Sequence, residues 1–114
     1  MVVINQIKNK IKQLGARRRA SAYVRYLEGN RVPISAAYLF GSYVKGNTNK
    51  WSDVDVCVVS PLFRTTDALS FLWHGRRTED VKNSIEPVGF DEESFADPNN
   101  ELAYEIKKTG IRIG

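Results

Sequence analysis

The sequence contains few of the residues that build cross-linked or histidine-rich proteins. Among its 114 residues there is one cysteine, Cys57, and one histidine, His74. A single cysteine excludes an internal disulfide framework, and a single histidine excludes a metal site built from several imidazoles. Cys57 lies in an apolar run, where a thiol is usually packed rather than reactive. Nothing here indicates an oxidising compartment, so the cytoplasm is the expected location.

Long apolar runs are also absent. The apolar start at residues 1–4 is too short for a signal peptide, and no run approaches the length of a membrane span. The chain has no repeats, low-complexity tracts or linkers. Its hydrophobic fraction (42%) and charged fraction (26%) are those of an ordinary soluble globular protein. We therefore expect one domain over residues 1–114 and no contact with a membrane.

The net charge is a modest +4, partly clustered in Arg17, Arg18 and Arg19. On a helix, three consecutive residues span most of a turn and form no single stripe. No aromatic residues alternate with them to make a platform for single-stranded nucleic acid. A solvated helix face, or contact with an acidic partner, is therefore the preferred interpretation. A nucleic-acid partner is not expected.

Two carboxylates stand at the start of a strand-like segment. Valines alternate with Asp53 and Asp55 and continue the apolar run at residues 54–59, which predicts a strand. Alternate side chains of a strand share a face, so the two carboxylates point the same way, about 6.6 Å apart along the backbone. They can bracket two divalent cations, which lie about 3.5–4 Å apart in two-metal phosphoryl-transfer sites. Oxygen ligands of this kind suit Mg²⁺. Taken alone, an Asp-x-Asp pair is more often a solvated strand edge.

A Gly-Ser pair closes the preceding apolar run at residues 36–40. Gly41 lets the chain turn and approach a ligand with no Cβ in the way. Ser42 adds a hydroxyl, and backbone N–H groups at the start of a following helix would face an anion. Lys45 could reach phosphates from the same segment. A Gly-Ser pair alone is a common turn, but here ten residues separate it from the Asp-x-Asp pair that follows. Together they indicate a phosphate grip beside a metal site.

This combination resembles the signature of the DNA polymerase β-type nucleotidyltransferase superfamily. The pattern is Gly-Ser, ten residues, then Asp-x-Asp, and Lys45-Gly46 stand where many relatives have a basic residue followed by Gly. The specific likeness covers residues 40–59. The short chain resembles the minimal nucleotidyltransferase branch of this superfamily. The resemblance implies a polymerase-β-like nucleotidyltransferase fold.

The family also implies a third acid on a neighbouring strand, and the candidate is Glu86. Such a carboxylate can bind the metal nearest the incoming hydroxyl and help to remove its proton, while Asp53 and Asp55 hold both metals. Pro87 follows directly and allows only an edge strand, a strand end or a bulge. Three acidic residues that are more typical of a helix first turn are rivals for this role: Asp91, Glu92 and Glu93.

The expected reaction is therefore nucleotidyl transfer. ATP with two Mg²⁺ ions would lie over Asp53 and Asp55, with its terminal phosphates on Gly41 and Ser42. A hydroxyl activated near Glu86 would attack the α-phosphate and displace pyrophosphate. Larger relatives add a second domain that selects the acceptor, so here we expect the acceptor to be another protein, another copy or a diffusing molecule. Resemblance to the minimal branch implies a small helical HEPN-domain toxin, which the enzyme would adenylylate as its antitoxin.

Two alternatives remain. The chain could be a non-catalytic binding module that neutralises or scaffolds a partner protein, with a vestigial or regulatory nucleotide site. It could also be an antibiotic-modifying nucleotidyltransferase, which is disfavoured because no acidic cleft-forming domain is present to hold a polycation. Several other residues have a less favoured functional interpretation. Four basic residues could reach phosphates but are expected to be solvated charges: Lys50, Arg64, Arg76 and Arg77. Trp51 and Trp73 are expected to be packing or partner contacts rather than base-stacking groups, and His74 a surface or interface residue rather than a catalytic one.

The periodicity predicts an α+β fold, a small mixed β-sheet with helices packed mainly on one face. The N-terminal third is helical, and Gly15 is expected to weaken it and divide it in two. Another helix is expected to open at residues 65–67 and to contain residues 68–73. Gly75 ends or bends it, and Arg76-Arg77 begin a charged connection. The remaining predicted elements are strands at 36–40, 54–59, 85–90 and 111–113, a short helix or turn at 43–46, and helices at 91–95 and from 97 through 106.

Overall fold

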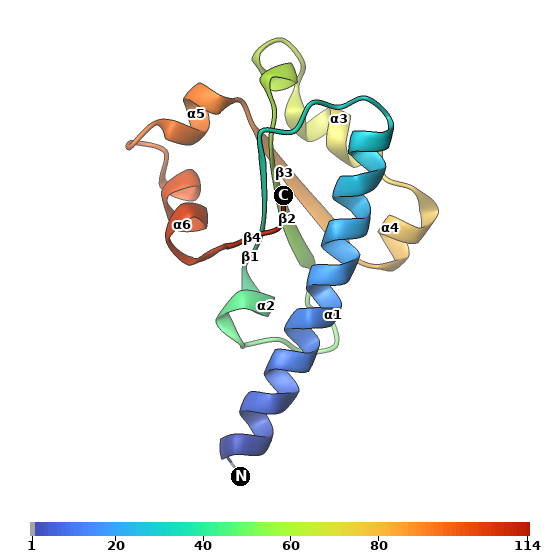
Figure 1. Cartoon of the computed structure of the whole chain (residues 1–114), viewed down its shortest axis with the longest axis vertical. Coiled ribbons are helices and arrows are strands. Elements are labelled where there is room, and N and C mark those ends of the chain that lie inside the picture. The colour runs from blue at the N-terminus through green and yellow to red at the C-terminus, as the bar shows by residue number, and fades with distance from the viewer. Residues whose placement is uncertain (1) are drawn as a thin grey trace.

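The computed structural model describes residues 2–114 (Figure 1). Helices and strands alternate along most of the chain, as the periodicity predicts. Within residues 2–114, no helix combines the length and apolar character needed to cross a bilayer. The elements are, in order, α1 Val2–Gly29, β1 Ala36–Phe40, α2 Ser42–Lys45, β2 Val54–Val59, a 3₁₀ turn Pro61–Arg64, α3 Ala68–His74, α4 Thr78–Lys82, β3 Ile85–Phe90, α5 Glu92–Ala96, α6 Glu101–Thr109 and β4 Ile111–Arg112.

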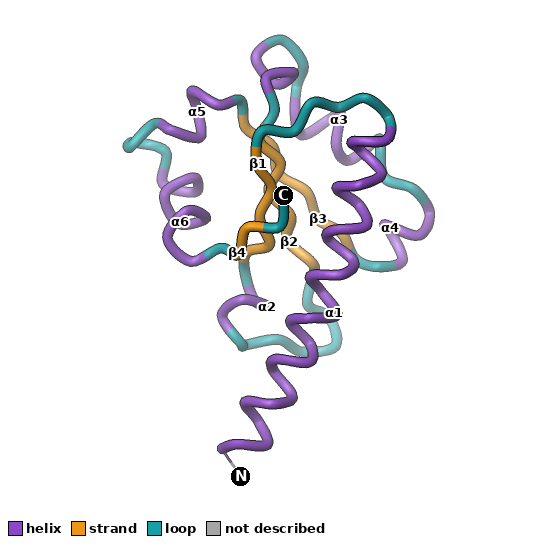
Figure 2. Tube along the Cα trace, viewed as in Figure 1, coloured by secondary structure: helices purple, strands orange, loops and turns teal. Residues whose placement is uncertain are grey.

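The strands form one mixed sheet in the order β3-β2-β1-β4 (Figure 2). β1 runs antiparallel to both β2 and β4, whereas β2 and β3 are parallel. β3 is an edge strand, and Pro87 within it lies opposite Val56 of β2. An edge position tolerates a residue that cannot donate a backbone hydrogen bond, as the sequence requires. The predicted mixed sheet is confirmed.

Helices cover both faces of the sheet, with the larger set on one of them. On that face, Tyr23 of α1 and Leu72 of α3 pack with Leu39 and Val56 of the central strands. The Tyr23 hydroxyl donates to the Leu72 carbonyl oxygen at 3.2 Å. The opposite face has a smaller core, which the short helices α5 and α6 cover. Its buried members are Ala36, Cys57, Val59, Phe95, Ala103 and Ile106.

The N-terminal helix differs from the expectation that Gly15 divides it. α1 is continuous from Val2 to Gly29. Gly15 lies among good helix formers, and a glycine at one interior position costs only about 1 kcal/mol relative to alanine. Burial of Ala16, Ala20 and Tyr23 against the sheet outweighs that cost. α1 therefore remains helical through Gly15 and extends on the N-terminal side of Ala16, the first of its residues in this core.

Two shorter helices also differ from expectation. α4 occupies part of the stretch where only a charged connection was expected, and α6 begins at Glu101 rather than at residue 97. In α4 the buried carboxylate of Asp80 accepts hydrogen bonds from the Arg77 backbone and side chain, all at 2.9 Å. The side chain of Asn100 caps α6 by accepting from the Ala103 N–H at 3.1 Å. The N-termini of α4 and α6 are thus set by capping hydrogen bonds, not by a periodic pattern of apolar residues.

Candidate active site

Three predicted site carboxylates meet at one end of the sheet. Asp55 lies directly opposite Glu86 in the parallel pairing of β2 with β3, so the two side chains share a face. Asp53 precedes Asp55 by two residues, just before β2 begins. The structure thus brings together acids that are more than 30 residues apart in the sequence.

The carboxylates occupy the part of this face that the helices leave open. Farther along the same face, Cys57 and Val59 are buried beneath α5 and α6. Asp55 and Glu86, at the start of their strands, are only partly buried, and Asp53 is exposed. A ligand can therefore approach all three carboxylates from solvent.

The proximity of the acids raises the pKa values of Asp55 and Glu86. Burial and the adjacent charge of Asp53 raise the pKa of Asp55 to about 6, against the opposing effect of Lys45. A hydrogen bond shared with Asp53, followed by burial and the charges of both aspartates, raises the pKa of Glu86 to about 7. Arg76 acts in the opposite direction on the pKa of Glu86. Without a counter-charge, the three carboxylates repel one another near neutral pH.

Gly41 packs against this acid cluster. Its φ angle is +81°, in the left-handed region that favours glycine. A Cβ at this position would fall on the Oδ2 atom of Asp55. Ser42 begins the single turn α2, which ends at Gly46 with φ +80°. The Gly-Ser pair thus lies immediately beside the carboxylates, as its spacing in the sequence predicts.

Lys45 lies at the end of α2 and faces two acids. Its charge lowers the pKa of Asp55, which places it within electrostatic reach of the carboxylate cluster. Its Nζ atom is also 3.5 Å from Oε1 of Glu105 on α6, and both side chains are about half exposed. Ion pairs of this exposure contribute at most about 1 kcal/mol, so Lys45 is free to exchange Glu105 for a phosphate.

The donor set fits a hard divalent cation. Asp53, Asp55 and Glu86 supply only carboxylate oxygens, the ligands that Mg²⁺ takes in proteins. The raised pKa values of Asp55 and Glu86 reflect crowded negative charge that a cation would neutralise. Within residues 2–114, however, no three acidic, histidine or cysteine side chains lie close enough to form a finished metal cage. Magnesium that also binds substrate phosphates needs only part of its ligands from protein.

Sequence and structure comparisons agree with this arrangement. The family described as the nucleotidyltransferase domain matches residues 26–109. The chain belongs to this family. Its Gly-Ser pair and all three carboxylates lie inside the matched region. Membership establishes a nucleotidyltransferase domain and hence nucleotidyl transfer as the general chemistry of the fold.

A solved structure has the same fold. It is a crystal structure of a "putative nucleotidyltransferase" from Sulfolobus solfataricus, with a TM-score of 0.63 and 16% sequence identity. The match covers 91% of this chain and 84% of that one. No curated protein matches the sequence.

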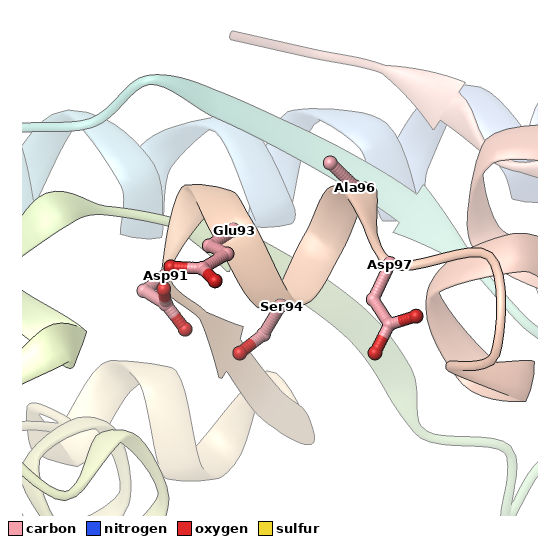
Figure 3. A pocket seen from close by; sticks show the side chains of 5 residues that line it. All are labelled: Asp91, Glu93, Ser94, Ala96 and Asp97. Atoms are coloured by element: carbon pink, nitrogen blue, oxygen red, sulfur yellow. The ribbon is translucent and has the colours of Figure 1, made fainter.

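The rival acids for the third position lie elsewhere in this nucleotidyltransferase domain. Asp91 follows the last residue of β3, whereas Glu86 is near its first, so about 16 Å of extended strand separates them. Figure 3 shows Asp91 just before α5 and Glu93 on it, beside a pocket of about 580 Å³ that Ser94, Ala96 and Asp97 also line. This pocket lies at the opposite end of β3 from the carboxylate cluster. The geometry favours Glu86 as the third acid.

One neighbour of the site, Arg76, was expected from the sequence to be a solvated charge, although it could reach phosphates. Arg76 stacks on the Trp73 ring at 4.1 Å and donates from Nη1 to the Ile85 carbonyl oxygen at 3.2 Å. Trp73 is itself fixed by donating from its indole nitrogen to the Pro87 carbonyl oxygen at 3.0 Å. These contacts hold a guanidinium along the outer edge of β3, next to Glu86. In the sequence, Arg76 is only an arginine after the end of a predicted helix, and such a residue cannot be distinguished from a solvated charge.

The other discounted residues take structural or exposed positions. His74 is exposed at the end of α3, where it shares a hydrogen bond with Ser70 at 3.1 Å. Trp51 is 79% exposed, and Lys50 lies over its ring at 4.9 Å. Arg64 pairs with Glu92 at 3.3 Å, away from the site. Arg77 is bound by Asp80 and Glu79 in α4. The hydrogen bonds and ion pairs described for these side chains go to other residues.

Proposed function

We propose that this domain is a Mg²⁺-dependent nucleotidyltransferase that moves AMP from ATP to a hydroxyl group on a partner protein. The observation that carries the proposal is the placement of Asp53, Asp55 and Glu86 on one open face, beside the Gly41-Ser42 turn. Family membership supports nucleotidyl transfer in general. ATP as the donor, Mg²⁺ as the metal and a protein as the acceptor go beyond family membership and are part of the proposal.

Each residue has a chemical role in this proposal. The three carboxylates would hold two Mg²⁺ ions, whose chemistry is to neutralise phosphate charge and favour the attacking alkoxide. Gly41 leaves space beside Asp55, and Ser42 and Lys45 would bind the terminal phosphates. Because α2 is a single turn, these contacts depend on individual donors rather than on a large helix dipole.

The transfer step needs no reactant besides ATP, the acceptor hydroxyl and water. The acceptor oxygen forms a bond to the α-phosphorus while the bond from that phosphorus to the β-phosphate oxygen breaks. Pyrophosphate leaves with the electron pair. Glu86 would accept the hydroxyl proton as a general base and pass it to water.

The acceptor we propose is a small helical HEPN-domain protein, the toxin of a toxin–antitoxin pair in the cytoplasm. The support for this partner is the resemblance to minimal nucleotidyltransferases, which commonly lack an acceptor-selecting domain of their own. One observation favours the rival function of a non-catalytic binding module. Within the described part of the chain, the acids do not form a finished metal cage. A transfer assay separates the two.

The assay incubates the chain with Mg²⁺, ATP labelled at the α-phosphate and the protein encoded by the adjacent gene. We expect label on the partner, and none when ATP is labelled at the γ-phosphate. The double variant Asp53→Asn, Asp55→Asn should lower transfer at least about 100-fold, whereas Asp91→Asn should not lower it. If the partner is never labelled and the double variant still neutralises it, the chain is a binding module instead.

A further inference from the structure

The N-terminal half of α1 carries a stripe of exposed aliphatic side chains. Ile4, Ile7, Ile11 and Leu14 are between 47% and 63% exposed, and Val3 is 64% exposed. Among the described residues, eleven large apolar side chains are exposed, and five of them belong to this half-helix. Clustered exposed apolar residues of this kind mark interaction sites more often than scattered ones do.

The stripe faces away from the rest of the domain. At 100° per residue, Ile4 and Ile11 lie about opposite the direction of Ala16 and Ala20, which are fully buried against the sheet. The side of the half-helix that faces α2 is polar instead, and Gln13 donates there to the Tyr43 carbonyl oxygen at 3.3 Å. This reverses the usual pattern, in which the apolar side of a helix faces its own core. In Figure 1 this half of α1 extends beyond the sheet and the other helices.

The spacing of the stripe fits a second helix. Ile4, Ile7, Ile11 and Leu14 follow one another at intervals of three, four and three residues, the pattern of a two-helix seam. The seam spans about 15 Å, or nearly three turns. A shallow pocket of about 290 Å³ continues it toward the C-terminal half of α1. The pocket is lined by Leu14, Arg17, Arg18, Ser21 and Arg25.

The charge of α1 decides what kind of helix fits. The first acidic residue of the chain is Glu28, and seven lysines and arginines precede it. Lys8 and Lys10 flank the stripe on its two sides, and Arg18 and Arg25 lie in line with it. A second copy of α1 would oppose these cations with its own in either orientation, which disfavours self-association. A helix with acidic flanks would neutralise them.

A lipid surface fits less well. Helices that lie in a membrane interface place their cations on the polar side and anchor with aromatic residues. Here arginines continue the apolar line itself, and the first aromatic residue of the chain is Tyr23, which is fully buried. The narrow seam suits the knobs and holes of a partner helix better than the broad apolar side of an interfacial helix.

We propose that this face of α1 is the docking site for an acidic amphipathic helix of another protein. The partner would place aliphatic side chains on the stripe from Ile4 to Leu14 and carboxylates on Arg17, Arg18 and Arg25. The proposal does not depend on nucleotidyl transfer, since the stripe uses no residue of the carboxylate site. Loss of catalysis would leave it intact, and loss of docking would leave the site intact.

A peptide-binding experiment with the full chain tests this surface. The probe is a synthetic fluorescent helical peptide with leucine at heptad positions a and d and glutamate at e and g. We expect binding that weakens with added salt, and at least about tenfold weaker binding for the double variant Ile7→Ser, Ile11→Ser. Arg17→Glu with Arg18→Glu should have a comparable effect. Leu69→Ser, at a 60% exposed position on α3, should not change the affinity.

Four results would overturn the proposal. The first two are no binding of the glutamate peptide, and equal binding of a matched peptide with lysine at e and g. The third is a dimer in sedimentation that the double variant Ile7→Ser, Ile11→Ser converts to a monomer. The fourth is binding of the chain to phosphatidylglycerol vesicles but not to the peptide. Circular dichroism of each variant confirms that it is folded, so that lost binding reports the surface.

Discussion

At the scale of single residues, position 41 requires glycine for two separate reasons. The backbone there has φ +81°, and a Cβ would collide with the Asp55 carboxylate. Gly46 provides a matched control because its φ is +80°, but a Cβ there would meet only Asn9 at 3.5 Å, an ordinary contact. The two positions thus share backbone strain and differ in contact with the site.

The first prediction compares alanine at these two glycines. Both substitutions should destabilise the fold by about 1 kcal/mol, because each forces alanine into the left-handed region. Only Gly41→Ala should also displace Asp55 and lower nucleotidyl transfer, by at least about tenfold. Urea unfolding and the transfer rate measure the two effects. Equal transfer rates in the two variants would show that contact between Gly41 and Asp55 is irrelevant to the site.

The second prediction concerns Arg76, whose positive charge lowers the pKa of Glu86. Arg76→Gln removes that charge, so the pKa of Glu86 should rise further. Since Glu86 must be deprotonated to accept a proton, the acidic limb of the pH–rate profile should move to higher pH. Arg64→Gln, which breaks only the pair with Glu92, should leave the limb in place. A limb that does not move would separate Arg76 from the chemistry.

These residues also show what could be read from sequence at this scale. The Gly-Ser and Asp-x-Asp pairs lie in one short segment, so the chain itself fixes their proximity once β1 and β2 pair. Glu86 could be inferred only with the help of the family resemblance, because its register against Asp55 is a tertiary contact. Arg76 could not be singled out, since its position depends on stacking against Trp73 and on the Ile85 carbonyl.

At the scale of elements, the strands were predictable and several helix boundaries were not. The predicted strands 36–40, 54–59 and 85–90 coincide with β1, β2 and β3, because short, largely apolar segments end at clear turn residues. α4 has the sequence TEDVK, with a single apolar residue and therefore no period to detect. Its formation depends on the Arg77–Asp80 contacts, which no pattern of hydrophobicity records.

The third prediction tests the continuity of α1 at Gly15. No other atom lies within 4 Å of a Cβ added there. Gly15→Ala should therefore raise the free energy of unfolding by about 1 kcal/mol, since alanine is the better helix former. Urea unfolding followed by circular dichroism measures the change. An unchanged or lowered free energy of unfolding would mean that the helix is interrupted at Gly15 in solution.

At the scale of the whole molecule, the open acid cluster makes stability depend on pH. The pKa values of Asp55 and Glu86 in the fold are about 6 and about 7, above the ordinary values of about 4. The folded state therefore holds more protons than the unfolded chain between these limits. The stability that these groups contribute is fully present below about pH 4 and is lost as pH rises toward about 7.

The fourth prediction follows from this sign. In EDTA, Asp55→Asn and Glu86→Gln should each gain free energy of unfolding relative to the unmodified chain as pH rises from about 4 to 7. Asp91→Asn is the opposite control, because hydrogen bonding to Ser94 lowers the pKa of Asp91. Its loss should cost stability above the ordinary carboxyl pKa and not below it. Urea unfolding across this pH range measures all three, and parallel curves would contradict the assignment.

The two surfaces of the molecule, the carboxylate site and the apolar stripe on α1, differ in how far the sequence predicts them. The Gly-Ser and Asp-x-Asp part of the carboxylate site could be inferred because a short motif carries it, whereas Glu86 joins it only through the register of β3 against β2. The α1 stripe could not be inferred, because the same isoleucine spacing also predicts a helix that packs on its own core. Only the structure shows that the buried side of α1 is the one with Ala16, Ala20 and Tyr23.

The most direct test of the carboxylate site needs no acceptor. Titration calorimetry measures the binding of an ATP analogue with a methylene bridge between the α- and β-phosphates, with Mg²⁺ or with EDTA. We predict binding that requires Mg²⁺ and weakens at least about tenfold in the variant Asp53→Asn, Asp55→Asn. Equal affinity in EDTA, or in that variant, would contradict the assignment of these carboxylates to a metal–nucleotide site.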